Sequence, residues 1–486
     1  MTRTATLGDS AARGAAATML GQFARVGIQV AGLVVLARLL APADYGLLAM
    51  VLAVIGIGEI FRDFGLSAAA IQAKTLSRGE RDNLFWVNTG IGFVLMILCL
   101  GASYVLPLVY DEPRLQGITA MLSVTFLFNG MSTQLRADLT RNLRFGRLAL
   151  IEIVAPLLGL LIGIGAALLG ATYWSLVAQQ VAVPLISLVM LISVTQWLPS
   201  PPNRAVSIRH FIGFGANLLG VQLLTYASRN VDSIVVGARF GPTALGFYDR
   251  AFQLLLLPLN QINAPATRVA LPVLSRLQDE PAKFDTFLLR GQSLLVHGIT
   301  AVFMFAAFNA PALVEVLLGD KWLPSAILFQ LLAIGGIAQG LSYATYWVFL
   351  AFGLTASNLR YALATRPILV GAVLVGAAWG PNGVALGYSL TLLAFWPFGL
   401  WWISRVSRAP AWSMFLAGAR AASGYLICGV VSGQIAHWID FSAPLELVIG
   451  AAAFTAVFAG VVLVWPAFRA DVRALLQLRS AFRREK

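Results

Sequence analysis

Long apolar stretches separated by short polar connections are the dominant pattern of the chain. Gly and Pro often punctuate the gaps between them. About 20 consecutive apolar residues suffice for a helix to cross a bilayer, whereas membrane barrels show shorter alternating segments. We therefore predict an all-α membrane protein with about fourteen spans, placed at about 14–38, 44–70, 83–109, 116–137, 148–170, 172–195, 210–236, 243–267, 287–310, 323–352, 358–378, 382–403, 412–435 and 444–465.

Composition supports a membrane protein and excludes two other classes. Hydrophobic residues make up 59% of the chain and charged residues only 11%, while soluble domains carry about 25% charged residues. Disorder requires low hydrophobicity and high charge, so it is excluded as well. Cys99 and Cys428 both lie in apolar stretches without metal-site or disulfide spacing, and are predicted to be buried small hydrophobes.

The distribution of basic residues predicts the orientation. Alternate connections together with both termini hold roughly 23 Lys and Arg, against 4 on the opposite side. Cytoplasmic loops of membrane proteins are enriched in these residues, so both termini are predicted to be cytoplasmic and the number of spans even. The net charge of +13 thus reflects topology, and no nucleic-acid partner is expected. We expect no cleavable signal at the N-terminus.

A turn sequence occurs twice, 200 residues apart. The first copy is ARLLAPADYG (37–46) and the second is ARFGPTALG (238–246), each with Gly four residues after Pro. Each follows an odd-numbered span, which indicates a parallel internal repeat. We predict an N-lobe (1–195), a cytoplasmic linker (196–209), a C-lobe (210–404), two further spans (405–466) and a basic amphipathic tail (467–486) on the inner membrane surface. A regulatory or partner-binding role of the tail stays open.

Polar residues at membrane depth concentrate in the repeat-equivalent first, second, seventh and eighth spans. Charges inside a bilayer are costly and usually face a cavity or a partner. Arginine binds phosphate through its bidentate fork, while amides suit sugar hydroxyls. The predicted substrate-binding residues are Arg25, Arg62, Arg229, Arg250, Gln22, Gln29, Asn260 and Asn263, and the candidates for binding a coupling ion are Glu59, Asp63, Asp232 and Asp249.

The alternative is that some of these charges only pair with one another. Glu59 and Arg62 are three residues apart and share a helix face, which favours such pairing. Arg25 has no acid within one helical turn, which favours a ligand. Four further polar residues lie within predicted spans, but the sequence does not place them: Arg136, Glu152, Arg366 and Arg420.

No pattern of catalytic residues is present. The three histidines, at positions 210, 297 and 437, lack metal-site or catalytic spacing, and there is no phosphate-binding loop of the GxxxxGK[ST] form. Asp111 and Glu112 follow the third span in a connection too short for a glycosyltransferase site. We predict no enzyme, no metal and no cofactor.

Four segments carry a resemblance to a known family: ARLLAPADYGLLAM (37–50), FRDFGLSAAAIQ (61–72), NVDSIVVGARFGPTALGFYDRAFQLLLLPLNQI (230–262) and ALPVLSRLQDEPAKF (270–284). GDKWLPSA (319–326) adds to them. With these segments the chain resembles the polysaccharide transporter (Wzx-like flippase) family of the multidrug/oligosaccharidyl-lipid/polysaccharide exporter superfamily, within it the colanic-acid and lipopolysaccharide exporter branch.

The resemblance implies transport of an undecaprenyl-pyrophosphate-linked oligosaccharide to the periplasmic leaflet of a bacterial inner membrane, by alternating access of two lobes around a cationic cavity. It implies a lipid-linked glycan and membrane lipids as partners, with a polymerase and a chain-length regulator as further candidates. Coupling to membrane potential, Na⁺ or H⁺ stays open. Alternative functions are a cation-coupled multidrug exporter and a non-transporting scaffold of a polysaccharide assembly complex.

Overall fold

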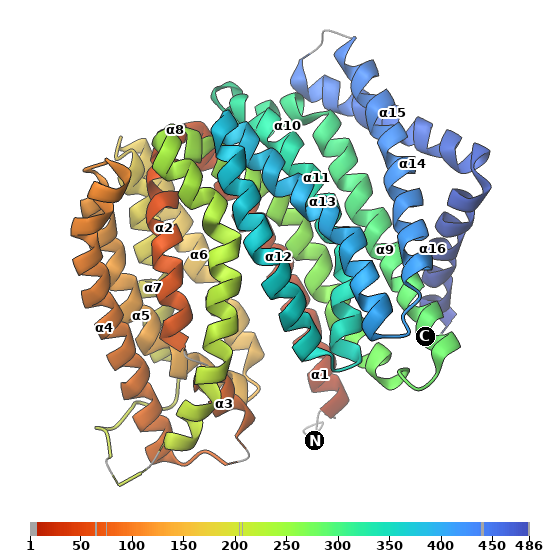
Figure 1. The fold of residues 1–486 in the computed structure, drawn as a ribbon. Helices are drawn as coiled ribbons and strands as arrows, with labels where there is room; N and C mark the ends of the chain where they lie inside the picture. The colour runs from red at the N-terminus through yellow and green to blue at the C-terminus, as the bar shows by residue number, and fades with distance from the viewer. Residues whose placement is uncertain are drawn as a thin grey trace, which may run out of the picture. The chain divides into compact units, whose positions relative to one another are not determined.

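The computed structural model describes the backbone of residues 7–484 apart from 64–65, 74, 204, 207 and 439–441. The side chains of 7–20, of most of 209–229 and of 476–484 lie outside the described set. In the part of the chain so described, all regular secondary structure is helical (Figure 1). The prediction of an all-α membrane protein is thus confirmed.

Thirteen long helices account for the membrane spans within the described residues. They are α1 (Leu7–Leu39), α2 (Pro42–Asp63), α4 (Arg78–Tyr110), α5 (Leu115–Arg141), α6 (Phe145–Leu168), α7 (Tyr173–Val194), α8 (Arg209–Arg276), α9 (Pro281–Phe308), α11 (Pro324–Ala351), α12 (Thr355–Gly376), α13 (Gly380–Val406), α14 (Ala411–His437) and α15 (Ala443–Val464). The 68-residue α8 bends at Gly241, where φ is +79°, and so joins two spans. The fourteen predicted spans are therefore present.

The described residues also form three shorter α-helices, α3 (Leu66–Gln72), α10 (Ala310–Leu318) and α16 (Pro466–Arg484), and two 3-10 helices, η1 (Asp320–Trp322) and η2 (Ala377–Trp379). The predicted span 44–70 is in fact α2 followed by α3.

The next long helix, α4, begins at a capping box in which Ser77 Oγ accepts from the Glu80 backbone N–H and the Glu80 carboxylate accepts from the Ser77 N–H. This cap satisfies backbone donors at the helix start that would otherwise lack partners.

Ten described segments are long and apolar enough to cross a membrane, and one of them covers both α12 and α13. α5 is not among them because polar residues occupy much of its length. These residues face neighbouring helices rather than lipid: Asp138, for example, is buried and accepts a hydrogen bond from Arg81 at 2.6 Å. α5 is therefore a central helix whose polarity is neutralised by its neighbours.

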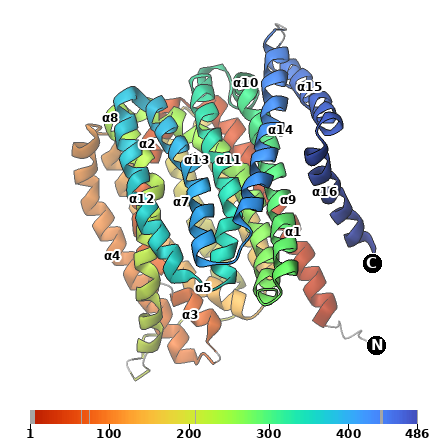
Figure 2. The same ribbon diagram turned by 45° about the vertical axis from the view of Figure 1, so that its right-hand side comes forward.

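The chain divides into two compact units, Met1–Gly246 and Phe247–Lys486. In the first, α4 packs along α5, α6 along α7, and α5 along α7. In the second, α9 packs along α11, α12 along α13, and α11 along α13 (Figures 1 and 2). The same three pairings thus recur at equivalent positions, as two pseudo-symmetric six-helix lobes require. The predicted lobe boundaries, including the linker at 196–209, remain predictions.

The two copies of the repeated turn contact each other reciprocally within the first unit. Pro42 starts α2 and Pro242 follows the bend in α8. A Cβ atom on Gly46 would overlap the carbonyl oxygen of Pro242, and one on Gly246 would overlap that of Pro42. Each glycine is therefore required because the backbone of the other copy lies against it.

Replacing Gly46 with Ala should destabilise the protein. The added methyl group would force the two turns apart, and overpacking of this kind typically costs about 1–3 kcal/mol. Gly101→Ala is the matched control, because nothing lies within 4 Å of a Cβ at this position in α4. The apparent unfolding temperature of the purified protein should fall for Gly46→Ala and stay level or rise for Gly101→Ala. Equal values for the two variants would contradict the close contact.

Candidate functional site

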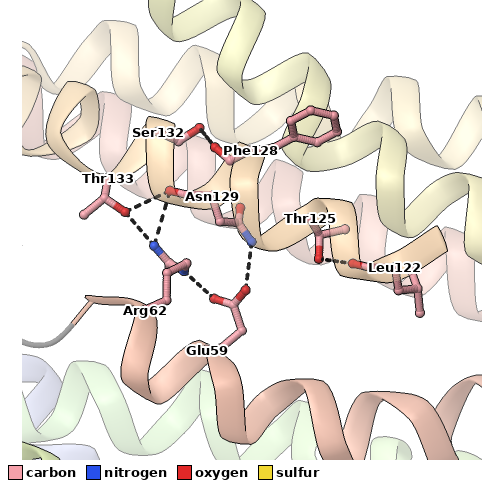
Figure 3. A network of polar contacts seen from close by, with 8 residues as sticks. All are labelled: Glu59, Arg62, Leu122, Thr125, Phe128, Asn129, Ser132 and Thr133. Atoms are coloured by element: carbon pink, nitrogen blue, oxygen red, sulfur yellow. Dashed lines mark hydrogen bonds and ion pairs between the residues drawn. The ribbon is translucent and has the colours of Figure 1, made fainter. Parts of the chain in front are cut away.

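A polar network joins α2 to α5 inside the first unit (Figure 3). Arg62 Nε donates to Glu59 Oε2 at 2.6 Å. The Nη1 atom of Arg62 donates to Thr133 Oγ1 at 2.5 Å and to the Asn129 carbonyl oxygen at 3.3 Å. Asn129 Nδ2 donates in turn to Glu59 Oε1 at 3.0 Å. The guanidinium and the carboxylate are thus held both by each other and by α5.

Helical spacing produces this network. Glu59 and Arg62 lie three residues apart on α2, and Asn129 and Thr133 lie four apart on α5, so each pair shares one helix face. Their side chains project toward one another across the contact between the two helices (Figure 3). The local pairing predicted for Glu59 and Arg62 is present, and α5 adds two polar partners.

A second ion-pair group involves α1, α5, α6 and α7. Arg25 on α1 pairs through Nη2 with Oε2 of Glu152 on α6. The other oxygen of Glu152 lies 3.7 Å from Nη1 of Arg136, and Arg136 Nη2 donates to Ser187 Oγ at 2.6 Å. Arg25 therefore has an acidic partner, although none lies within one helical turn of it.

The two groups meet on α5, which carries Arg136 of one group and the Asn129 and Thr133 partners of the other. We call Arg25, Glu59, Arg62, Arg136 and Glu152 the arginine cluster. Three guanidinium groups and two carboxylates leave it with one net positive charge. Side-chain exposure ranges from 20% for Arg62 to 42% for Arg25, so the cluster is only partly enclosed. Such a cluster can exchange an internal carboxylate for an external anion.

Two of the four predicted residues of the second unit pair with each other. Arg250 is buried and donates to Asp249 Oδ2 at 2.7 Å, and Gln253 donates to the same oxygen at 3.2 Å. Asn263 is buried, and its side-chain oxygen has no hydrogen-bond partner among the described residues. Asn260 is exposed. Asp249 and Arg250 thus neutralise each other, and their assignment as ion and substrate ligands stays a prediction.

The other candidates of the first unit lie on α1, α2 and α8. Gln22 and Gln29 on α1 are exposed. Asp232 is buried, and its Oδ1 accepts from the Ser233 backbone N–H at 2.9 Å. The side chains of Arg229 and Asp63 lie outside the described residues, so their roles stay predictions.

Four residues that join the arginine cluster or hold it in place are absent from the predicted site. Arg136 and Glu152 are polar residues within predicted spans that the sequence does not assign to a site. Asn129 and Thr133 are neutral and lie with Arg136 on α5. All four lie on α5 or α6, outside the four spans that the repeat singles out. For Asn129 and Thr133, the four-residue spacing of polar positions on α5 is the one available signal.

Among the described residues, no group of three or more His, Cys, Asp or Glu side chains could hold a metal ion. The acidic connection between α4 and α5 is also unsuited to acid catalysis. Arg114 Nε and Nη2 donate to the two oxygens of Glu112 at 2.8 and 2.7 Å, and these bonds hold the pKa of Glu112 below its usual range. A carboxyl group so stabilised stays ionised at neutral pH and is a poor general acid.

Known proteins share both the sequence pattern and the fold. The chain is 24% identical to the lipopolysaccharide biosynthesis protein WzxC of Escherichia coli over 377 residues, which cover 75% of each chain. It is 23% identical to the succinoglycan biosynthesis transport protein ExoT of Rhizobium meliloti over 484 residues, covering 96% of this chain and 94% of ExoT. These matches agree with the prediction of a membrane transport protein and not an enzyme.

The structure is similar to that of the lipid II flippase MurJ in an inward closed conformation. The TM-score is 0.69 at 14% sequence identity, and the match covers 91% of this chain and 98% of MurJ. At this identity the likeness establishes the fold alone. The sequence family described as "Polysaccharide biosynthesis protein" matches residues 35–327. This match covers more than half of the chain, which therefore belongs to the polysaccharide biosynthesis protein family.

Proposed function

We propose that the chain is a flippase that moves an undecaprenyl-pyrophosphate-linked oligosaccharide from the cytoplasmic to the periplasmic leaflet for export of surface polysaccharide. It does so by alternating access of its two lobes around a cationic cavity. The observation that carries the proposal is the arginine cluster, in which three guanidinium groups pair with two carboxylates among the residues whose side chains the structure describes. A net positive charge at membrane depth, in a chain of this family, suits an anionic substrate.

The chemistry of the cluster favours a pyrophosphate. Guanidinium groups stay charged and offer parallel N–H donors that match phosphate oxygens. Arg25 and Arg136 share Glu152, so an incoming phosphate can bind one arginine while Glu152 stays paired with the other. Because both arginines are about 40% exposed, a ligand can reach them without disrupting the helix packing.

The same charge balance argues against the alternative functions. A multidrug exporter of cationic compounds needs an unpaired carboxylate, and both carboxylates of the cluster are engaged with arginines. A scaffold would have no need for a net positive charge inside the membrane, where it is costly.

The proposal extends to location and coupling. The family match supports a location in the bacterial inner membrane, and the basic loops support cytoplasmic termini. A polymerase and a chain-length regulator would take over the exported units. No cofactor is needed, and transport would be driven by the membrane potential, by Na⁺ or by H⁺, with Glu59, Asp63, Asp232 and Asp249 as the acids available to a cation.

Neutralising Arg25 should slow flipping even when its ion-pair partner is neutralised too. Arg25→Gln alone leaves Glu152 paired with Arg136, whereas Arg25→Gln with Glu152→Gln removes both charges of the pair and leaves Arg136 bonded to Ser187. We expect both variants to fold and to flip lipid-linked oligosaccharide at least about 10-fold more slowly, because a charge-assisted hydrogen bond is lost. Surface polysaccharide in a flippase-deleted strain, normalised to membrane protein level, measures the effect.

The control is an exposed ion pair of the same kind. Lys283 and Glu280 form one at the start of α9, with side chains 70% and 50% exposed. Neutralising both with Gln should leave export unchanged. Full export by the Arg25/Glu152 double variant would show that Arg25 serves only to neutralise Glu152, and its binding role would then be wrong.

Flipping should depend on membrane potential if the pyrophosphate crosses with its charge. Outward movement of one negative charge from a negative interior is favoured by about 2.3 kcal/mol per 100 mV, about fifty-fold in the equilibrium ratio. Proteoliposomes with an imposed potassium diffusion potential, negative on the donor side, should therefore flip faster than vesicles without one. Equal rates over a range of potentials would contradict electrogenic transport.

A further inference from the structure

The tail helix α16 folds against α9 and α14 in the second unit (Figure 2). Phe468 is fully buried. Its ring makes an edge-on contact with Tyr425 and a tilted contact with His297. Arg420 on α14 holds Asp471 of α16 through two hydrogen bonds, of 2.9 and 3.1 Å. An apolar anchor and a bidentate ion pair together fix this helix at the ends of the other two.

A cavity of about 340 Å³ lies between these three helices. Its polar wall is formed by the Arg420–Asp471 pair, by Arg290 and Ser293 of α9, and by Ser413 of α14. The described residues provide no ion-pair or hydrogen-bond partner for Arg290 or for the two serine hydroxyls. Since Arg420 is neutralised by Asp471, Arg290 gives the cavity one net positive charge. The cavity therefore offers a guanidinium fork and two hydroxyl donors that no residue with a described side chain uses.

The rest of the cavity wall is apolar. Leu289, Leu416 and Leu475 line it, one from each helix. The three leucines suit hydrocarbon, while the guanidinium and the hydroxyls suit phosphate oxygens. The charge distribution along the chain assigns this end of α9 and α14 to the cytoplasmic side, where anionic lipids attract basic residues. A ligand that has a phosphate group next to acyl chains meets both requirements.

From this arrangement we propose that the cavity between α9, α14 and α16 binds the headgroup phosphate of an anionic phospholipid, with Arg290 as its main ligand. The lipid bridges α16 to the helix bundle. This site lies in the second unit and is separate from the arginine cluster of the first, so the proposal stands whether or not the chain flips a glycan.

Phosphatidylglycerol should stabilise the purified full-length protein, and Arg290→Gln should remove the effect. The apparent unfolding temperature in detergent is measured against added phosphatidylglycerol, phosphatidylcholine with the same acyl chains, or inorganic phosphate. We expect a rise with phosphatidylglycerol alone, and an at least about tenfold higher lipid requirement in the variant. Arg360→Gln is the control, since Arg360 is an exposed arginine of α12 outside the cavity. It should respond to phosphatidylglycerol as the unmodified protein does.

Each other outcome overturns the proposal in a defined way. An undiminished phosphatidylglycerol effect in Arg290→Gln would place lipid binding elsewhere, and an equal loss in Arg360→Gln would indicate a general charge effect. Equal stabilisation by inorganic phosphate would identify a soluble anion as the ligand. Leu475→Trp, which fills the cavity and keeps every charge, is an independent check: native mass spectrometry should show less retained phosphatidylglycerol, and unchanged retention would also contradict the site.

Discussion

A charged side chain within a membrane helix must be paired or must reach water, and this constraint determines how the first unit is built. Arg62 and Arg25 each hold a carboxylate, and those carboxylates lie on α2 and on α6. α5 then occupies the centre, since it supplies both Arg136 and the amide and hydroxyl that complete the network around Arg62. The least apolar helix of the unit can therefore be its most enclosed one.

Much of the fold could be predicted from hydrophobic periodicity and charge, because both act along a single helix. The span positions, the repeat and the Glu59–Arg62 pair are all local in this sense. The partner of Arg25 could not be predicted in this way, since Glu152 lies 127 residues away and only helix packing brings the two together. Within α8 the backbone leaves the helical conformation at Gly241, with φ +79° and ψ −178°, and this break lies between the two spans that the hydrophobic pattern predicts at 210–236 and 243–267.

The tail illustrates the same limit. Its alternation of apolar residues and arginines predicted an amphipathic helix, and α16 is one. Amphipathicity alone does not distinguish a helix that lies on lipid from one that packs on protein. Asp471, the one acid of α16, pairs with Arg420 and, together with the buried Phe468, holds the helix against protein. An apolar anchor and one residue of opposite charge thus make a contact that the hydrophobic pattern alone leaves open.

The reciprocal contact of the two turns has a consequence for divergence after gene duplication. Gly46 lies against Pro242 while Gly246 lies against Pro42, so the surface is self-complementary, as in a symmetric dimer of identical subunits. Neither copy can acquire a side chain at its glycine unless the other copy moves its backbone. Substitutions in one copy of the turn are therefore constrained by the other copy, whereas the two halves of the sequence can diverge independently where they do not touch.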